Sequence, residues 1–467
     1  MISNVDNENV EWNSEEERNI VLAEGYFHRA YWYYRLVHQF GDVPLLVEEI
    51  TRPRLDLNTF KKEAILKKIR DDMEFAVQWL PVNAVAGKEN RAAGYHLLTK
   101  IYLSLGEFQN AVDAASQVID GGSYQLMTER FGQGRYANNP RFNVLWDLHE
   151  KENISSAANS EWILAAQNQF ETEGSLGPTI RMRFATPLWW WSRVRDPNGE
   201  RGSIDGAEGN PLSDSLGRGI SANRTTPYYN YTIWKDPNDL RHSEVNWFSR
   251  DDFYYNNPAS EFFGEPYVEE FIGIDTIRAF YPFPYNKLFV PDEINEHKKS
   301  GGFSDWYIFR LAGTYLLRAE AYYWMGQMGQ AAADINAVRE RAEAEPVNAG
   351  EVTIDYIFDE RARELYWEIP RKTELTRAAF IFAREGRNGF SLENMHMDNW
   401  YFDRVMETNV FFRENRTYGQ TWVMEPFHVY WPVPQTDIDN NINGTINQNK
   451  GYVGAENNIE PLDLEDL

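Results

Sequence analysis

Residues 91–122 read RAAGYHLLTKIYLSLGEFQNAVDAASQVIDGG, and this stretch decides the fold of the chain. Apolar residues recur every three or four positions on both sides of Gly106, which predicts two helices joined by a tight turn. The pattern returns when Gly326 is placed over Gly106, so that Tyr322 matches Tyr102 and Val338 matches Val118. Such hairpins are typical of tetratricopeptide-type repeats. Two unrelated hairpins with similar packing needs are the alternative.

The flanking sequence predicts more helices of the same kind. Ser14 opens a capping box with Glu17, and apolar residues at helical spacing follow up to Val37. Further helices are predicted over residues 65–80 and 354–366, each followed by a proline. Three carboxylates, Glu360, Glu364 and Glu368, share one face of the latter, and we expect that face to be solvated and ion-paired. The acidic end, residues 456–467, is expected to fray.

Composition excludes several classes of function. The formal net charge of −25 argues against a nucleic-acid or anionic-membrane surface, because both need a positive patch. The chain has no cysteine, so disulfides, thiolate catalysis and thiolate metal sites are excluded. No run of about 18 apolar residues and no signal peptide is visible in the sequence.

The middle of the chain, residues 124–306, has a different character. It is rich in Gly, Pro, Asn and aromatic residues and lacks a helical or alternating period, most clearly over residues 187–255. Exposed Trp and Tyr faces stack on sugar rings, and Asn, Asp and Arg bind hydroxyl groups. Burial of these rings in a small core of their own is the alternative. The predicted ligand-binding residues are Trp189, Trp190, Trp191, Arg193, Tyr229, Asn230, Trp234, Asp236, Trp247 and Trp306.

Motifs of catalysis and metal binding are incomplete. Residues 439–444 match the first half of a calcium loop, but Lys450 occupies the position of its closing Glu, which favours an Asn-rich turn. His149-Glu150 lacks the second His of a zinc-protease helix, and Gly132-Gln133-Gly134 lacks a third glycine. We therefore predict no catalytic residue, no metal and no cofactor.

Seven ordered blocks resemble the SusD/RagB family of outer-membrane nutrient-binding lipoproteins. The first two, residues 23–37 and 40–45, resemble the family's N-terminal hallmark. The remaining blocks follow in the family's order and comprise residues 92–106, 308–321, 335–342, 360–377 and 431–452. The sequence departs from the family at Ile369-Pro370, where relatives have a Gly and a basic or polar residue; we expect this to shift a helix boundary and little else.

The resemblance implies a mainly α-helical fold, in which tetratricopeptide-like hairpins form a scaffold for a large irregular ligand-binding insert. We expect one compact unit with an N-terminal scaffold (1–123), the variable insert (124–306) and a C-terminal segment (307–467). It also implies a non-catalytic protein on the cell surface that delivers glycans to a SusC-type TonB-dependent transporter. The family's N-terminal lipid anchor is not in this sequence, so we expect the first several dozen residues of the precursor to be missing; an unanchored variant of the family is the alternative.

Two other functions stay open at this stage. Capture of peptides, as in the RagB branch, uses the same scaffold, and the acidic charge would favour basic peptides. A glycoside hydrolase would need two carboxylates about 5 to 10 Å apart across a cleft.

Overall fold

A computed structural model describes residues 2–5, 9–175, 177–190, 193–204, 215–271, 276–291, 301–409, 416–417 and 420–467. The longer helices are α2 (Glu15–Phe40), α3 (Lys62–Trp79), α4 (Arg91–Ser104), α5 (Phe108–Ile119), α11 (Leu311–Trp324), α12 (Met328–Arg341), α13 (Ile354–Leu365), α14 (Arg371–Arg384) and α15 (Trp400–Thr408). Among the described residues, no helix has the length and apolarity that a bilayer crossing requires. The fold class predicted from the sequence, a mainly helical scaffold with an insert, is confirmed.

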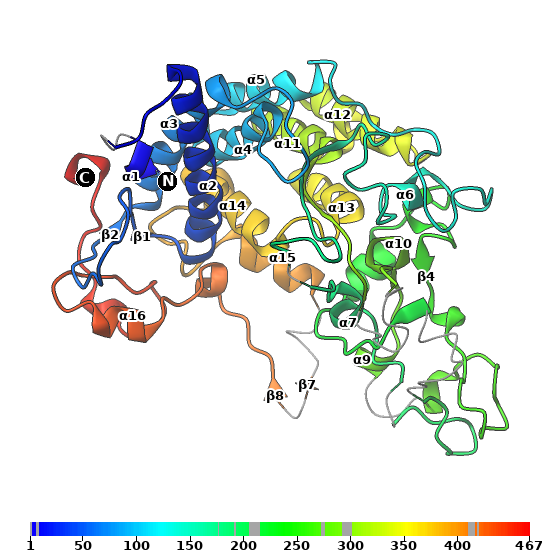
Figure 1. The fold of residues 1–467 in the computed structure, drawn as a ribbon. Helices are drawn as coiled ribbons and strands as arrows, with labels where there is room; N and C mark the ends of the chain where they lie inside the picture. Colours follow the sequence, from blue (N-terminus) through cyan, green and yellow to red (C-terminus); the bar gives the residue numbers. More distant parts are fainter. Residues whose placement is uncertain are drawn as a thin grey trace.

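The two predicted hairpins form as matched pairs. Helices α4 and α5 turn at Gly106, and α11 and α12 turn at Gly326, with φ of 71° and 76° at the two glycines. Ala111, Ala115 and Ala331 are fully buried at the helix crossings, because small side chains let the helices approach closely. Helix α11 also packs against α5, so the two hairpins lie side by side (Figure 1).

One large hydrophobic core joins the N-terminal and C-terminal helices. It runs through α2–α5, α11, α14 and α15, and Phe27, Ile69, Leu97 and Ile381 are among its most buried members. Tyr34 of α2 donates a hydrogen bond to Glu374 of α14 across this core, at 3.1 Å. The division of the chain at 123 and 306 stays a prediction, but helices from both sides of the insert share this core.

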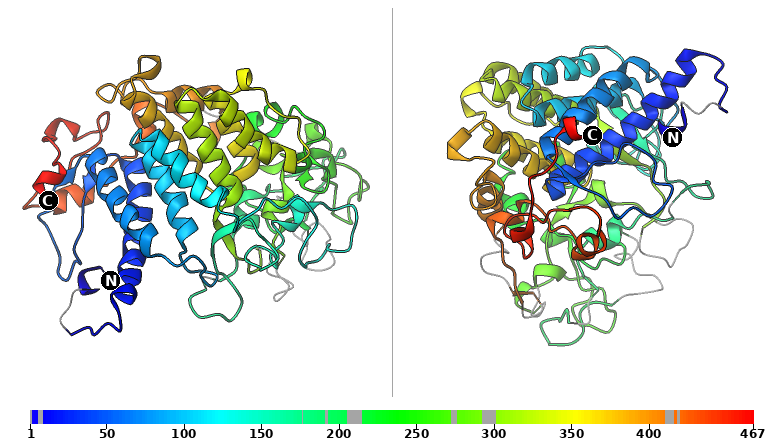
Figure 2. Two further views of the ribbon diagram at one scale, coloured as in Figure 1. Left: turned by 90° about the horizontal axis from the view of Figure 1, so that it is seen from above. Right: turned by 90° about the vertical axis from the view of Figure 1, so that its left-hand side faces the viewer.

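The insert leaves and re-enters the scaffold through a pair of strands. Strand β3 (Trp162–Ala166) pairs antiparallel with β6 (Trp306–Arg310), and Ile163, Leu164 and Phe309 bind this pair to the main core. The segments between these strands lie to one side of the helices, remote from both chain ends (Figures 1 and 2). The insert's short elements are α6 (Val144–Asp147), α7 (Arg181–Ala185), α9 (Thr276–Ala279), α10 (Tyr285–Leu288), the π-helix η1 (Tyr228–Thr232), β4 (Trp247–Phe248) and β5 (Phe283–Pro284).

The insert has an aromatic core of its own. Trp189, Phe253, Tyr255, Tyr281 and Phe283 are completely or almost completely buried in it. Aromatic side chains pack here edge to face and stacked, which lets a segment with little regular structure bury apolar area. Burial of these rings in a small core of their own is the alternative to ligand binding that the sequence left open. That alternative is correct for this group of rings.

The expectation of a solvated carboxylate face on α13 is wrong. Glu360 and Glu364 are buried, because α13 lies beneath the insert and receives arginines from several elements. Glu364 pairs with Arg310 at 2.7 Å and also with Arg341, while Arg241 of the insert reaches Glu360 at 2.6 Å. Arg339 and Arg363 also pair with Glu360, so five guanidinium groups around two carboxylates compensate the cost of burying these charges. This network binds the insert to the scaffold.

The C-terminal segment is ordered along the N-terminal helices. Leu462 pairs with Phe60, next to the two-residue strands β1 (Val43–Pro44) and β2 (Thr59–Phe60). The expected fraying of residues 456–467 is therefore wrong. Asn441, within the half-matched calcium motif, binds both the N–H and the C=O of Leu57 at 2.8 Å. The remaining short elements are α1 (Ile2–Val5), α16 (Gln435–Asn440), β7 (Arg416–Thr417) and β8 (Gln420–Thr421).

Candidate ligand-binding site

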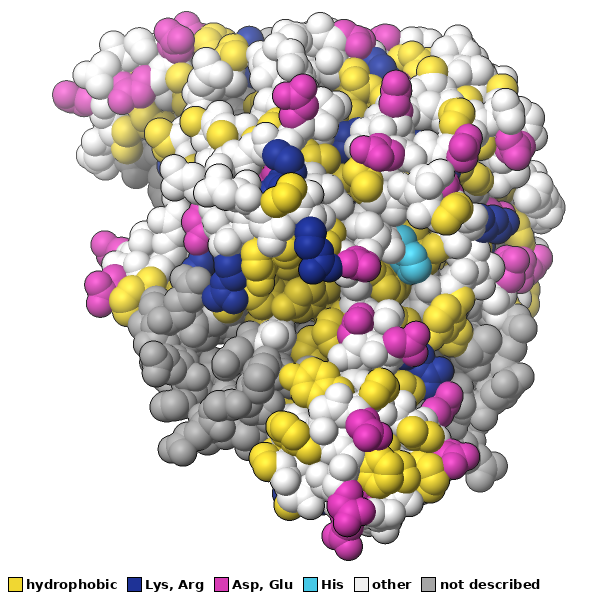
Figure 3. Space-filling view, turned by 90° about the vertical axis from the view of Figure 1, so that its right-hand side faces the viewer, with side chains coloured by type: hydrophobic (Ala, Val, Ile, Leu, Met, Phe, Trp, Pro, Cys, Tyr) yellow, Lys and Arg dark blue, Asp and Glu magenta, His cyan; other side chains and the backbone are white. Residues whose placement is uncertain are grey.

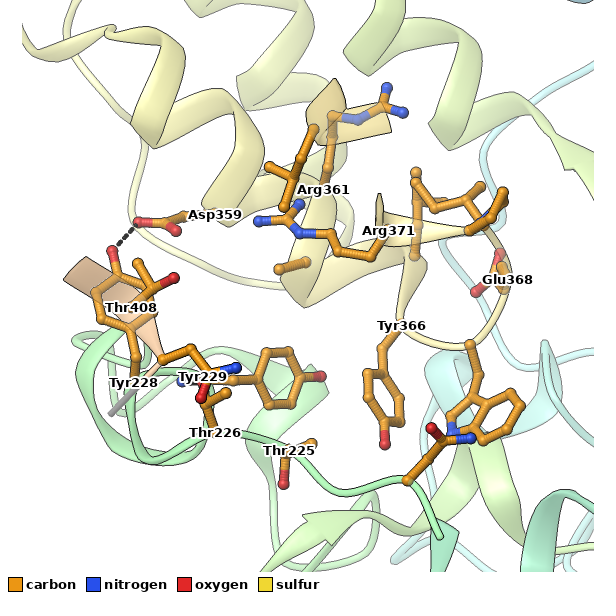
Figure 4. A pocket seen from close by; sticks show the side chains of 18 of the residues that line it. Thr225, Thr226, Tyr228, Tyr229, Asp359, Arg361, Tyr366, Glu368, Arg371 and Thr408 are labelled. Carbon is orange, nitrogen blue, oxygen red and sulfur yellow. Dashed lines mark hydrogen bonds between the residues drawn. The ribbon is translucent and has the colours of Figure 1, made fainter. Parts of the chain in front are cut away.

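A cavity of about 650 Å³ lies where the insert meets the scaffold. Residues 223–233 of the insert form one side, and residues 359–371, at the junction of α13 and α14, form the other (Figure 4). Trp306 of β6, Arg35 of α2 and residues 404–409 of α15 complete the wall. This volume falls in the range of small-molecule sites, which are clefts lined by apolar groups and a few polar ones.

Five aromatic residues line the cavity: Tyr228, Tyr229, Trp306, Tyr366 and Trp367. Tyr229 stacks on Tyr366 at 5.1 Å between centroids, and Trp306 meets Trp367 edge to face at 6.0 Å. In the first pair, Tyr229 belongs to the insert; in the second, Trp306 belongs to β6. Their partners, Tyr366 and Trp367, both lie at the α13–α14 junction. Rings held by packing lose little freedom on binding, so they are suitable as stacking faces.

A tight turn presents Tyr366 and Trp367. Helix α13 ends at Leu365, whose C=O accepts a hydrogen bond from the N–H of Glu368 at 3.0 Å. Tyr366 has φ −55° and ψ 130°, and Trp367 has a positive φ of 64°. These values define a type II turn, which favours Gly at the position that Trp367 occupies. The strain at a bulky residue in this position is typical of functional sites.

Polar groups are fixed around the rings. Tyr228 donates a hydrogen bond to Asp359 at 2.7 Å, drawn dashed in Figure 4, and Arg404 also pairs with Asp359. Burial raises the pKa of Tyr228, and its bond to Asp359 raises it further, so Tyr228 keeps its proton at neutral pH. The other cavity carboxylate, Glu368, binds Arg310 at 2.9 Å and Lys287 at 2.5 Å. Both carboxylates are thus held in ion pairs.

The structure places the predicted site residues in three groups. Tyr229 and Trp306 line the cavity. Trp234 and Trp247 contact Tyr229 from behind, with centroids 5.8 and 5.9 Å from its ring, and Asn230 is buried beside them. These residues support the wall and do not form part of it.

The other predicted residues lie away from the cavity. Trp189 is fully buried and donates to the C=O of Gly217 at 2.9 Å. Trp190 is partly buried beneath the guanidinium of Arg218, at 4.2 Å from its ring centroid. Asp236 accepts a hydrogen bond from the N–H of Glu345, and Arg193 is exposed. Trp191 lies outside the described residues.

Sequence reasoning missed the α13–α14 junction. All six residues from Tyr366 to Arg371 line the cavity, including Ile369 and Pro370, so the departure from the family at these positions affects more than a helix boundary. One sequence signal could have identified this wall: Tyr366 and Trp367 stand just before Pro370, where the helix was predicted to end. Aromatic rings at a helix end can point away from the core and toward a ligand. Among the described residues, no group of His, Asp and Glu side chains is arranged to hold a metal ion.

Hydrophobic side chains remain accessible on the surface. Figure 3 shows a face whose hollowed middle carries hydrophobic side chains with Lys and Arg side chains beside them. The exposed aromatic residues include Trp32, Phe170, Tyr231, Phe263, Trp422 and Trp431.

A helical-repeat scaffold with a ligand-sized cavity under an irregular insert is the architecture of a binding protein. The model of the SusD family matches residues 198–452, more than half of the chain, and a second model, described as starch-binding and associating with the outer membrane, matches residues 2–103. The chain belongs to the SusD family.

Curated relatives support this assignment. Starch-binding protein SusD of Bacteroides thetaiotaomicron is 33% identical over 145 residues, which are 31% of this chain and 21% of that protein. SusD-like protein P2 of Formosa agariphila is 33% identical over 112 residues, 23% of this chain and 22% of that protein. These matches thus span about a fifth of each relative.

Solved structures share the fold at low sequence identity. Surface glycan-binding protein A from Bacteroides uniformis superposes with a TM-score of 0.63 at 17% identity, covering 96% of this chain and 81% of that one. A laminarin-binding SusD-like protein gives 0.60 at 20% identity, covering 95% and 80%.

Proposed function

We propose that this protein is a non-catalytic binder that captures oligosaccharide or polysaccharide in the cavity between insert and scaffold. One observation carries the proposal: five aromatic rings and fixed polar groups converge on a cavity of about 650 Å³. Sugar rings stack on aromatic faces, while hydroxyl groups need donors and acceptors held in place. The names of relatives that bind starch, laminarin or other glycans support the same function.

The proposed setting is the outer surface of the outer membrane, where the protein would hand its ligand to a SusC-type TonB-dependent transporter. The description of the family model that matches residues 2–103, with its association with the outer membrane, supports this setting. In the full precursor an N-terminal lipid would anchor the chain. Co-purification of the anchored precursor with a SusC-type transporter expressed in the same outer membrane tests this part of the proposal.

Isothermal titration calorimetry with a panel of neutral and charged glycans and of peptides tests the binding function. We expect heat with at least one glycan and weaker binding by Trp306→Ala, which removes a cavity ring. Trp431→Ala is the matched control, because Trp431 is exposed and does not line the cavity. Binding of peptides alone would favour the RagB-like alternative and overturn the proposal.

A further inference from the structure

The wall of the cavity differs in charge from the rest of the molecule. The chain carries 71 acidic and 46 basic residues, giving a net charge of −25. Among the residues that line the cavity the balance is reversed, with two carboxylates, Asp359 and Glu368, against five arginines: Arg35, Arg224, Arg361, Arg371 and Arg404. A cleft lined by one sign of charge concentrates ligands of the opposite sign.

Some of this charge is neutralised within the protein. Arg404 pairs with Asp359, and Arg361 pairs with Glu374 at 2.7 Å. Glu368 is already paired with Arg310 and Lys287, neither of which lines the cavity. Its charge is therefore not available to the cavity arginines.

Arg35 and Arg371 have no such partner. Within the part of the chain that the structure describes, neither guanidinium forms an ion pair with a carboxylate. Arg371 donates from Nη1 to the C=O of Phe358 at 2.7 Å, and Arg35 lies over the ring of Tyr31 at 4.4 Å. Both side chains are thus held in place by neutral groups, and neither charge is neutralised by an ion pair, although Asp359 acts on Arg371 from a longer distance.

Arg361 lines the cavity but does not offer its charge to a ligand. It is buried, with 2% of its surface exposed, and lines the cavity. Only its Nη2 reaches Glu374; Nε and Nη1 have no acceptor among the described residues. These two nitrogen atoms are fully buried, and the Arg361 side chain points away from Tyr229 and Tyr366 (Figure 4), so a ligand in the cavity would not reach them.

The pKa of Arg371 is shifted in the opposite direction from that of the buried, ion-paired Arg310. Burial alone would lower the pKa of Arg310, but Glu368, Glu364 and Glu161 raise it well above the ordinary value. For Arg371, burial and neighbouring Arg404 lower the pKa to about 10, and the opposing effect of Asp359 does not offset them. Arg371 stays charged at neutral pH, yet its environment does not compensate the charge as it does elsewhere in this protein.

We propose that the ligand of this cavity is an anionic glycan, whose carboxylate or sulfate groups pair with Arg371 and with Arg35 while its rings stack on the aromatic wall. This inference rests on the proposed glycan-binding function. A guanidinium fork matches the geometry of a carboxylate or a sulfate, and such charge-assisted bonds are about twice as strong as neutral ones. The amino-terminal end of α14, at Pro370 and Arg371, adds positive potential to the same wall.

A neutral glycan is the competing ligand, because arginine also donates hydrogen bonds to hydroxyl groups. It would leave the charges of Arg35 and Arg371 uncompensated after water has been displaced, which is unfavourable. The same wall disfavours basic peptides, which the net charge of the whole chain had favoured. The charge of the site, not that of the molecule, is what a bound ligand meets.

Calorimetry with matched glycan pairs tests this inference. The carboxylate arm compares oligogalacturonate with its carboxyl-reduced form, and the sulfate arm compares carrageenan oligosaccharide with its desulfated form. We expect the anionic member of at least one pair to bind about ten- to a hundredfold more tightly. Raising the salt from about 0.05 to 0.5 M should weaken that binding, because the Debye length shortens to a few ångströms.

Two single substitutions then locate the anion. Arg371→Gln and Arg35→Gln should each lose most of the preference for the anionic member while still binding its neutral counterpart. Arg52→Gln, at an exposed arginine outside the cavity, should behave as the unmodified protein does. Far-UV circular dichroism and thermal unfolding identify any variant that has not folded, and Arg371→Lys then replaces Arg371→Gln; it keeps the charge and should retain part of the preference.

The outcomes separate the two proposals. Equal binding of neutral and anionic members overturns the anionic ligand and leaves glycan binding standing. An anionic preference unchanged by both arginine substitutions overturns it as well, because the anion then binds elsewhere. No heat with any glycan in the panel would count against the glycan-binding function itself.

Discussion

The ring of Tyr229 stacks on the ring of Tyr366, with centroids 5.1 Å apart and an interplanar angle of 26°. Tyr229 belongs to the insert, and Tyr366 follows helix α13 of the scaffold. Both rings line the cavity, so this contact joins the two parts of the molecule at the place where a ligand would enter. Aromatic pairs of this kind contribute about 0.5–1.5 kcal/mol beyond the area they bury.

Removal of one ring of this stack should therefore affect both binding and stability. We expect Tyr366→Ala to weaken glycan binding about tenfold or more and to lower the free energy of unfolding by about 3 kcal/mol, the usual cost of removing a buried aromatic ring. Tyr366→Phe keeps the ring and should bind nearly as the unmodified protein does. Calorimetry and urea denaturation measure the two effects; a Tyr366→Ala protein with unchanged affinity would show that the ligand does not use this wall.

The buried network beneath the cavity predicts acid sensitivity. Burial alone would raise the pKa of Glu360, but Arg241, Arg363 and Arg339 lower it from 4.5 to about 2. Because the folded pKa is depressed, the stabilisation is complete above about pH 4.5 and is lost as the pH falls toward 2. The shift corresponds to about 3 kcal/mol. Urea denaturation at pH 7, 4 and 2.5 should show this loss.

Glu360→Gln should remove this part of the pH dependence. At pH 7 the variant should be less stable by about 3–5 kcal/mol, because three guanidinium groups lose a buried counter-charge. Glu456→Gln, at an exposed carboxylate near the C-terminus, should match the unmodified protein at every pH. An unchanged acid transition in Glu360→Gln would contradict the assignment.

The two hairpin glycines provide a matched pair. Both have positive φ, 71° at Gly106 and 76° at Gly326, so alanine at either position costs about 1 kcal/mol in backbone strain. A Cβ on Gly106 would also collide with Arg384 Nη1, whereas none of the surrounding atoms lies within 4 Å of a Cβ on Gly326. Gly106→Ala should thus unfold at lower urea than Gly326→Ala. Equal midpoints would mean that the Arg384 side chain moves at no cost.

The helical scaffold could be predicted from the sequence because its signal is local. Spacing of apolar residues around Gly106 and Gly326 identifies the hairpins: α4 and α5 lie within residues 91–122, and α11 and α12 meet at Gly326. The burial of Glu360 could not be predicted in this way. A row of carboxylates at helical spacing has the pattern of a solvated face, and the arginines that bury it come from residues 241, 310 and 341, far away in sequence.

The cavity was predicted only in part for a related reason. Aromatic content pointed to the insert, and Tyr229 and Trp306 do line the cavity, but Trp189 fills the insert's own core. Exposure of a ring depends on which elements pack on it, and the insert has no period from which this could be inferred. The opposite wall, Tyr366 to Arg371, lies in a segment whose family resemblance suggested a purely structural role.

Trp367 should lower the free energy of unfolding through backbone strain and strengthen glycan binding through its ring. It occupies the position of a type II turn that favours glycine, with φ of 64°, and its ring meets Trp306 at 6.0 Å. Trp367→Ala and Trp367→Gly both remove the ring, so both should weaken glycan binding to the same extent, about tenfold. Only glycine also relieves the backbone strain, so Trp367→Gly should be more stable than Trp367→Ala by about 1 kcal/mol in urea denaturation. Equal stability of the two variants would contradict the strain, and unchanged affinity in both would remove Trp367 from the binding wall.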